Sequence, residues 1–392
     1  MSRLLLCYYF ACALLITCCS AQAEPPPFII GVDADLSSFA VDGGNAIKRG
    51  VQLAVDEINE NGGLLGRQVI VKTRDHRGNP ARGIHNINRF LSMNHLLAIV
   101  GGVHTPVVLA ELEAIHKNNT LLLVPWAAGT PIIDNGYSPN NVFRVSVRDA
   151  EAGKVLMQHA KEIGISRVAL VLERTAWGRS NDRSLTEAAA QLGITVASKH
   201  WINWQQNAFA DDITRLKTQN AQAVIMVTNV PEGAVVVNEL IRQKLSSLPV
   251  ISHWGIASGD FVKRLTLPAE KLDIVVLQTF HFNRQPTSKS KALRKKYSAK
   301  YGSSLNEDIP AAVGIAHAYD IVSMLAAAVK KANSSDVNTV RSTLETMAHH
   351  DGAVKFYSPA FTANQHDALF APDYFMATFN NDGHITTMEA GR

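Results

Sequence analysis

Two glycine-containing stretches of the sequence end in a Thr-Pro pair, and each pair could begin a helix. Thr105-Pro106 follows Gly101-Gly102, and Thr130-Pro131 follows Gly129. Threonine is a good N-cap, and proline suits the first helical position. The N–H groups and the positive dipole of a helix N-terminus favour an anion such as a carboxylate. Either threonine could simply cap a helix, but the repeated device favours a carboxylate site.

Aromatic residues follow other β-rich runs. Trp126, Trp177 and Trp254 are three of the five tryptophans, and each comes after a predicted strand, as does Asn229. A half-exposed tryptophan in such a position suits the wall of a pocket, although ordinary loop packing is the alternative.

The elements that position these residues alternate in two successive blocks. The first block predicts strands over 28–34, 68–73, 96–100 and 121–124, and the second over 167–172, 195–200, 223–228 and 249–252. Between these strands, apolar residues recur at helical spacing, for example over 44–61, and Gly62-Gly63 ends that helix. Such alternation indicates parallel strands with helices on both faces, so we expect an α/β fold with two Rossmann-like, doubly wound, parallel-sheet lobes.

The last third of the chain departs from this rhythm. Successive helices are predicted over 288–301, 310–331 and 337–347, before a strand-rich tail from 356 to 387. These helices cannot extend the second sheet, so we expect them to return to the first lobe and the lobes to share a multi-strand hinge. The expected division is 24–146 with 276–356 for lobe 1, and 147–275 with 357–392 for lobe 2.

Ligands of open α/β sheets bind beyond the carboxyl ends of the strands. We therefore expect the ligand between the lobes. The candidate ligand-binding residues at the predicted strand ends are Ser37, Ser38, His104, Thr105, Trp126, Ala127, Ala128, Gly129, Thr130, Trp177, Asn229 and Trp254.

Residues 1–23 are typical of a secretory signal peptide. Arg3 precedes an apolar run from Leu4 to Thr17, and Ala21-Gln22-Ala23 offers small residues for cleavage. All four cysteines lie in this leader, and a lipid anchor on Cys18 or Cys19 is the alternative to cleavage. The pattern predicts a periplasmic protein, and no later segment is expected to span a membrane.

The sequence lacks the motifs of the common enzyme classes. It has no Gly-x-Ser-x-Gly, no P-loop, no His-Glu-x-x-His and no dinucleotide-binding glycine motif after the first strand. A net charge of +4 is too small to indicate nucleic-acid binding. We therefore expect neither an enzyme nor a bound metal or cofactor.

The chain resembles the periplasmic branched-chain amino-acid binding proteins, which are type I solute-binding proteins of ATP-driven importers. The resemblance is most specific over Gly50–Arg67, and it extends to Ala98–Gly102, Pro125–Thr130 and Trp177-Gly178. It implies a receptor that captures a small carboxylate or amino-acid-like ligand and delivers it to the permease of an ABC importer. We expect the receptor to be a monomer. The alternative function is a ligand-sensing subunit that signals to a membrane receptor or kinase.

The resemblance also implies roles for single residues, and one expected residue is missing. Thr105 falls at a hydroxyl ligand, 127–130 at a carboxylate-binding loop, and Trp177 in place of a tyrosine that covers the ligand. The acid that pairs with the ligand's ammonium is absent near Trp254. Glu173 is the nearest acid in a strand-end loop of the second lobe, and because it lies four residues before Trp177 we expect it to point away from the cleft. The sequence therefore favours a carboxylate or amide without an α-amino group, with branched-chain amino acids and aromatic carboxylates left open.

Export is directly testable. Because signal peptidase should cleave after Ala23, mass spectrometry of protein from the periplasm should find an N-terminus at Glu24. A diacylated cysteine at position 18 or 19 would instead show a tethered lipoprotein.

Overall fold

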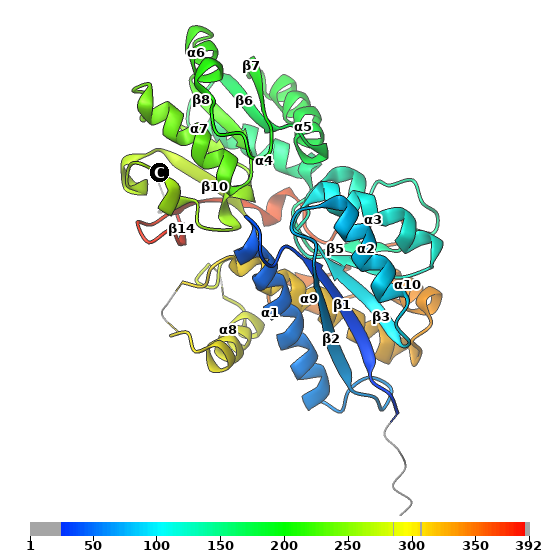
Figure 1. The fold of residues 1–392 in the computed structure, drawn as a ribbon. Helices are drawn as coiled ribbons and strands as arrows, with labels where there is room; N and C mark the ends of the chain where they lie inside the picture. Colours follow the sequence, from blue (N-terminus) through cyan, green and yellow to red (C-terminus); the bar gives the residue numbers. More distant parts are fainter. Residues whose placement is uncertain (1–24, 285, 306–307, 389–392) are drawn as a thin grey trace, which may run out of the picture.

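The computed structural model describes residues 25–284, 286–305 and 308–388, which form two α/β lobes (Figure 1). The predicted signal peptide lies outside the described residues. Lobe 1 is built on a five-stranded sheet in the order β2-β1-β3-β4-β5, in which every pairing is parallel. Its strands are β1 (Phe28–Ala34), β2 (Val69–Asp75), β3 (Leu96–Gly101), β4 (Leu122–Val124) and β5 (Val142–Arg144).

Lobe 2 repeats this topology and then adds a hairpin. The strands β7-β6-β8-β9-β10 lie in the same doubly wound order as the strands of lobe 1, and β13 and β14 extend the sheet in antiparallel fashion. The lobe 2 strands are β6 (Arg167–Glu173), β7 (Thr195–Ile202), β8 (Ala223–Val227), β9 (Val250–Ser252), β10 (Ile274–Gln278), β13 (Phe375–Phe379) and β14 (Ile385–Thr387). The expected parallel sheet is therefore mixed at this edge.

Helices complete both lobes. Lobe 1 carries α1 (Val41–Glu60), α2 (Pro80–Leu91), α3 (Thr105–Lys117), α8 (Ser288–Tyr301), α9 (Ala312–Ala332) and α10 (Val337–Thr346), with a small ladder of β11 (His350–Asp351) and β12 (Phe356–Tyr357). Lobe 2 carries α4 (Asp149–Glu162), α5 (Ala176–Leu192), α6 (Ala210–Thr218) and α7 (Val230–Arg242). Figure 1 shows the late helices α8–α10, yellow to orange, beside the blue and cyan elements of lobe 1.

The chain passes between the sheets three times. It leaves lobe 1 after β5, returns after β10, and enters lobe 2 again before β13. The expected division at 275/276 falls inside β10, and this strand pairs within the lobe 2 sheet along its length. The return to lobe 1 therefore lies beyond Gln278.

The first helix follows the apolar pattern of its sequence. Its buried face includes Ile47, Val51 and Ile58, and it packs along α9. Gly50 allows this close approach, because a Cβ there would lie 2.3 Å from the carbonyl oxygen of Ile315. Gly62 and Gly63 end the helix at φ values of 85° and 77°, which glycine adopts without steric cost.

The core helix α9 corrects one expectation from the sequence. Ala312–Ala332 is long and apolar enough to cross a membrane, which the sequence analysis did not expect of any later segment. However, 83% of its apolar 18-residue stretch is buried inside the protein, where the helix packs against α1 and α10. Its composition is thus explained by its place in the core of lobe 1.

Lobe 1 also contains two buried acids in contact. Asp33 on β1 and Glu111 on α3 are 0% and 1% exposed, and Asn86 Nδ2 donates to Asp33 Oδ1 at 2.8 Å. Burial raises the pKa of Asp33 to about 7. Burial and repulsion from Asp33 raise the pKa of Glu111 well above its usual value. Since both pKa values are raised on folding, this pair destabilises the fold as the pH rises above the unfolded values near 4.

We predict that Glu111→Gln gains stability relative to the wild type as the pH increases. One pKa unit corresponds to about 1.4 kcal/mol, so the relative gain from pH 5 to pH 8 should be on the order of 1–3 kcal/mol. Urea unfolding at both pH values measures it, with Glu113→Gln on the exposed face of α3 as the control. A pH-independent difference would show that the pair does not titrate in this range.

Candidate functional site

A small cavity lies between the lobes, where strand ends of both sheets meet. Its open volume is about 10 Å³. That is room for about one water molecule, so a ligand of amino-acid size needs the two walls to stand further apart. The cavity is lined by Val103, His104, Thr105, Pro106, Trp126 and Ala128 of lobe 1, and by Glu173, Trp177, Trp204, Asn229, Trp254 and Gly255 of lobe 2.

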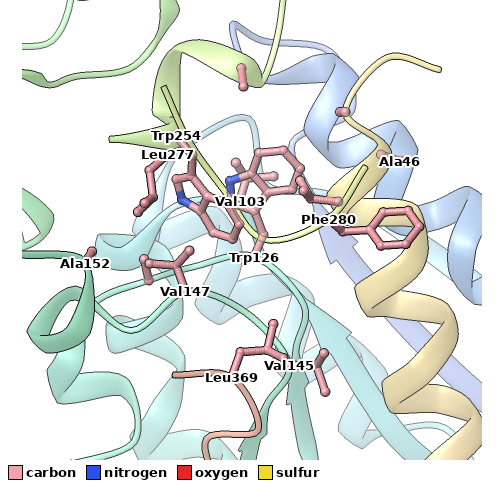
Figure 2. Packing of buried hydrophobic residues seen from close by; sticks show 14 of the residues in the cluster. Ala46, Val103, Trp126, Val145, Val147, Ala152, Trp254, Leu277, Phe280 and Leu369 are labelled. Atoms are coloured by element: carbon pink, nitrogen blue, oxygen red, sulfur yellow. The ribbon is translucent and has the colours of Figure 1, made fainter. Parts of the chain in front are cut away.

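Most of the expected site residues meet at this cavity. Those that line it are His104, Thr105, Trp126, Ala128, Trp177, Asn229 and Trp254. Trp126 and Trp254 face each other from opposite lobes with ring centroids 5.1 Å apart (Figure 2). The tryptophans at the strand ends therefore form walls shared by both lobes.

Five expected residues lie outside the lining. Ser37 Oγ donates to Asp75, and the backbone N–H of Ser38 donates to Asp35. Ala127 packs in the core of lobe 1, and Gly129 lies behind Thr105. Thr130 contacts lobe 2 elsewhere, since its N–H donates to Ser180 Oγ at 3.1 Å.

The two Thr-Pro pairs do not act as expected from the sequence. His104, not Thr105, is the N-cap of α3, and the Thr105 hydroxyl accepts a hydrogen bond from Gly129 N at 3.1 Å. The second pair begins a single 3₁₀ turn, Thr130–Ile132, whose first N–H is already bonded to Ser180. Of the two pairs, only the first therefore lies at the N-terminus of an α-helix beside the cavity.

Lobe 1 nevertheless offers donors to an anion. No described residue accepts a hydrogen bond from the backbone N–H of Thr105 or Ala128, and both residues line the cavity. Buried N–H groups are normally paired, so two such donors beside a cavity suit a carboxylate.

Arg144 fixes the loop that carries one of these donors. Its Nη1 donates to the carbonyl oxygens of Ala127 at 3.2 Å and Gly129 at 2.8 Å, and its Nε pairs with Asp367 at 2.5 Å. Both charged side chains are 0% exposed. Because the carbonyls on both sides of Ala128 are held, the orientation of the peptide between them is set.

Lobe 2 places an acid at the opposite side, which the sequence analysis expected to point away. Glu173 ends β6 and lines the cavity, fully buried. Its Oε1 accepts from Asn229 N at 2.6 Å and Nδ2 at 2.7 Å, and its Oε2 accepts from Trp204 Nε1 at 2.6 Å. Burial and repulsion from Glu232 raise the pKa of Glu173 to about 8, against the effect of these donors.

Two histidines border the lobe 1 side. His104 Nε2 lies 3.0 Å from Asp35 Oδ2. Burial would raise the pKa of Asp35, but hydrogen bonds and attraction from His104 bring it below its usual value. Burial lowers the pKa of His76 to about 3, so this second ring is neutral at physiological pH. The lobe 1 side of the cavity thus has a tightly paired acid behind His104.

Glu173 and Trp204 are the main residues that sequence reasoning missed. Glu173 is the last residue of its strand, and a parallel strand buried on both faces gives no alternating pattern that would show where its end points. Trp204 lies in an irregular turn two residues after β7. A fourth tryptophan near a strand end was the available signal, although the next one before it, Trp201, does not line the cavity.

The fold and the cavity together define an α/β receptor with its site between two lobes. The chain belongs to the periplasmic binding protein family, which it matches over residues 27–384. It has the type I fold and is similar to substrate-binding proteins of the branched-chain amino-acid type. This family membership implies an extracytoplasmic location and confirms the resemblance inferred from the sequence.

Curated relatives match most of the chain. It is 24% identical over 371 residues to Leu/Ile/Val-binding protein homolog 3 of Brucella melitensis biotype 1, covering 94% of this chain and 95% of that protein. It is 26% identical over 308 residues to the Leu/Ile/Val-binding protein BraC3 of Rhizobium johnstonii, covering 78% and 80%.

Solved structures show the same fold. A type 1 periplasmic binding protein from Bordetella pertussis Tohama I has a TM-score of 0.84 at 20% identity, covering 92% of this chain and all of that one. LivJ of Streptococcus pneumoniae, in complex with isoleucine, has a TM-score of 0.78 at 22% identity, with the same coverage. A solute-binding protein of Rhodopseudomonas palustris BisB5, in complex with 3,4-dihydroxybenzoic acid, has a TM-score of 0.76 at 16% identity, covering 93% and 96%.

We predict that Thr105→Val loosens the loop around Gly129. The substitution keeps the shape but removes the acceptor of a buried N–H, which costs about 1–3 kcal/mol. Urea unfolding should show this loss, and hydrogen exchange should accelerate over residues 127–131. Thr105→Ser keeps the hydroxyl and should retain slow exchange; equal exchange in both variants would show that this hydrogen bond does not order the loop.

Proposed function

We propose that this protein is a non-enzymatic receptor that closes on a small amino-acid-like carboxylate and delivers it to the permease of an ABC importer. The observation that carries the proposal is the polarity of the interlobe cavity. Free N–H groups of Thr105 and Ala128 border it on lobe 1, and the carboxyl group of Glu173 borders it on lobe 2. A zwitterion is complementary to such a site.

Glu173 changes the ligand expected from the sequence alone. Without an acid in the cleft, a buried ammonium would be poorly paired and would cost several kcal/mol. Glu173 supplies this acid at the end of β6, and Asn229 and Trp204 fix its position. An α-amino group therefore favours binding, in line with the Leu/Ile/Val-binding names of the relatives.

The mechanism follows from the contacts between the lobes. Trp126 meets Trp254 across the cavity, and Gly43 N donates to Ser258 O at 3.2 Å. Ligand contacts on both lobes stabilise a closed arrangement wide enough to hold the ligand, since only contacts that differ between open and closed states can shift the equilibrium. The closed form would then present the rims of both lobes to the permease as one surface. We propose that the exported receptor acts as a monomer in the periplasm.

Calorimetry with leucine, its keto acid 4-methyl-2-oxopentanoate and benzoate tests the ligand class. Leucine should bind most tightly, with micromolar or better affinity. A ligand ammonium requires ionised Glu173, whose pKa near 8 means that a proton must leave on binding at lower pH. Leucine affinity should therefore rise from pH 6 to pH 8, by up to about tenfold per pH unit.

Glu173→Gln should remove this pH dependence and weaken leucine binding, whereas Glu187→Gln on the exposed face of α5 should change neither. Tighter binding of the keto acid or benzoate than of leucine would contradict the amino-acid assignment. No binding of any of the three would contradict the proposed carboxylate receptor.

A further inference from the structure

Trp204 lines the cavity and contacts residues of both lobes. Its indole N–H donates to Glu173 of its own lobe, while its ring faces two side chains of lobe 1. The ring centroids lie 5.5 Å from Phe39 and 5.6 Å from His104, both in edge-on geometry. The side chain therefore bridges the cleft beside the cavity.

The turn that carries Trp204 is tied down by a second acid. Gln205 adopts a φ of 63°, and its N–H donates to Glu232 Oε1 at 2.8 Å. Glu232 is 1% exposed and lies in the first turn of α7. A non-glycine residue with positive φ persists only where its surroundings hold it, and here Glu232 and Glu173 hold adjacent residues.

The contacts of Trp204 differ in their dependence on closure. The bond from Trp204 to Glu173 and the bond from Gln205 to Glu232 lie within lobe 2 and can survive opening of the hinge. The contacts with Phe39 and His104 join separate lobes and must break when the lobes part. Because only such differential contacts bias the equilibrium, the indole ring stabilises the closed state specifically.

We propose that Trp204 is a positioning residue that acts as a latch, coupling the cavity acid Glu173 to closure of lobe 2 on lobe 1. The inference rests on the proposed function, because it gives the receptor a residue through which the occupant of the cavity affects closure. A ligand group that orders Glu173 also orders the indole bonded to it, and the indole meets lobe 1 through Phe39 and His104.

Interlobe distances test the latch with and without a ligand. Spin labels at Arg89→Cys on α2 and Lys217→Cys on α6 report the distance between the lobes. All native cysteines precede residue 20, so a chain that begins at Glu24 carries only the two introduced ones. Without ligand and with leucine, Trp204→Ala should reduce the short-distance population at least threefold. Trp204→Phe keeps an aromatic ring and should reduce the short-distance population by a smaller factor. Trp201→Phe, on the neighbouring strand and outside the cavity lining, should match the wild type.

Phe39 supplies a second readout that general loss of stability would not mimic. If the two rings act together, Trp204→Ala should have little further effect in a Phe39→Ala background. With leucine, the latch predicts an increase of at least tenfold in the dissociation rate of Trp204→Ala, and a change below threefold in the association rate. Circular dichroism verifies that each variant is folded.

The results separate the latch from the proposed function. Coincident distance distributions for the wild type and Trp204→Ala, or fully additive effects of Trp204 and Phe39, would overturn the latch. Failure of leucine, the keto acid and benzoate to bind the wild type would overturn the proposed function instead, and the ligand-free distances would still decide the latch.

Discussion

The buried ion pair between Arg144 and Asp367 is the constraint on which the site depends. Arg144 ends β5, the last strand of the lobe 1 sheet, and Asp367 lies on the final segment that returns to lobe 2. Backbone bonds join the same segments, since Arg144 N donates to His366 O and Ala368 N donates to Arg144 O. The charges are buried and must be paired, because removal of one partner of such a pair costs about 3–5 kcal/mol.

This pair also holds the loop over residues 127–129. The guanidinium donates to the carbonyls of Ala127 and Gly129, so the crossing segment and the loop share one side chain. Arg148 continues the network, as it contacts Asp367 at 3.2 Å and Asp134 at 2.7 Å. A displacement of the crossing segment on closure would therefore also displace the loop, because Arg144 contacts both. The ion pair thus couples the hinge to the cavity.

The sequence predicted the repeated elements well and the side-chain directions poorly. Short apolar runs between helical patterns predict buried strands such as 28–34, and the late helices return to lobe 1 as expected. The hydroxyl of Thr105 was assigned to its own helix because capping is the common local use, whereas here it serves Gly129, 24 residues away. Arg144 and Asp367 are separated by 223 residues, and no local pattern could pair them.

A single departure from a family pattern does not show that the cleft lacks an acid. The sequence has tryptophan where the resemblance implies an acid, and Trp254 packs on Trp126 of the other lobe with its side chain in the cavity wall. An acid that lines the cavity, Glu173, lies at the end of β6, two strands away in the sheet order β9-β8-β6. Strand ends of one sheet converge on one cleft, so several of them can supply the same charge. What the physics requires is a carboxylate within reach of the ligand and donors that hold it, and Asn229 and Trp204 fulfil the second condition for Glu173. The position of a charge in the closed cavity, rather than its position in the sequence, decides which ligands the cavity can bury.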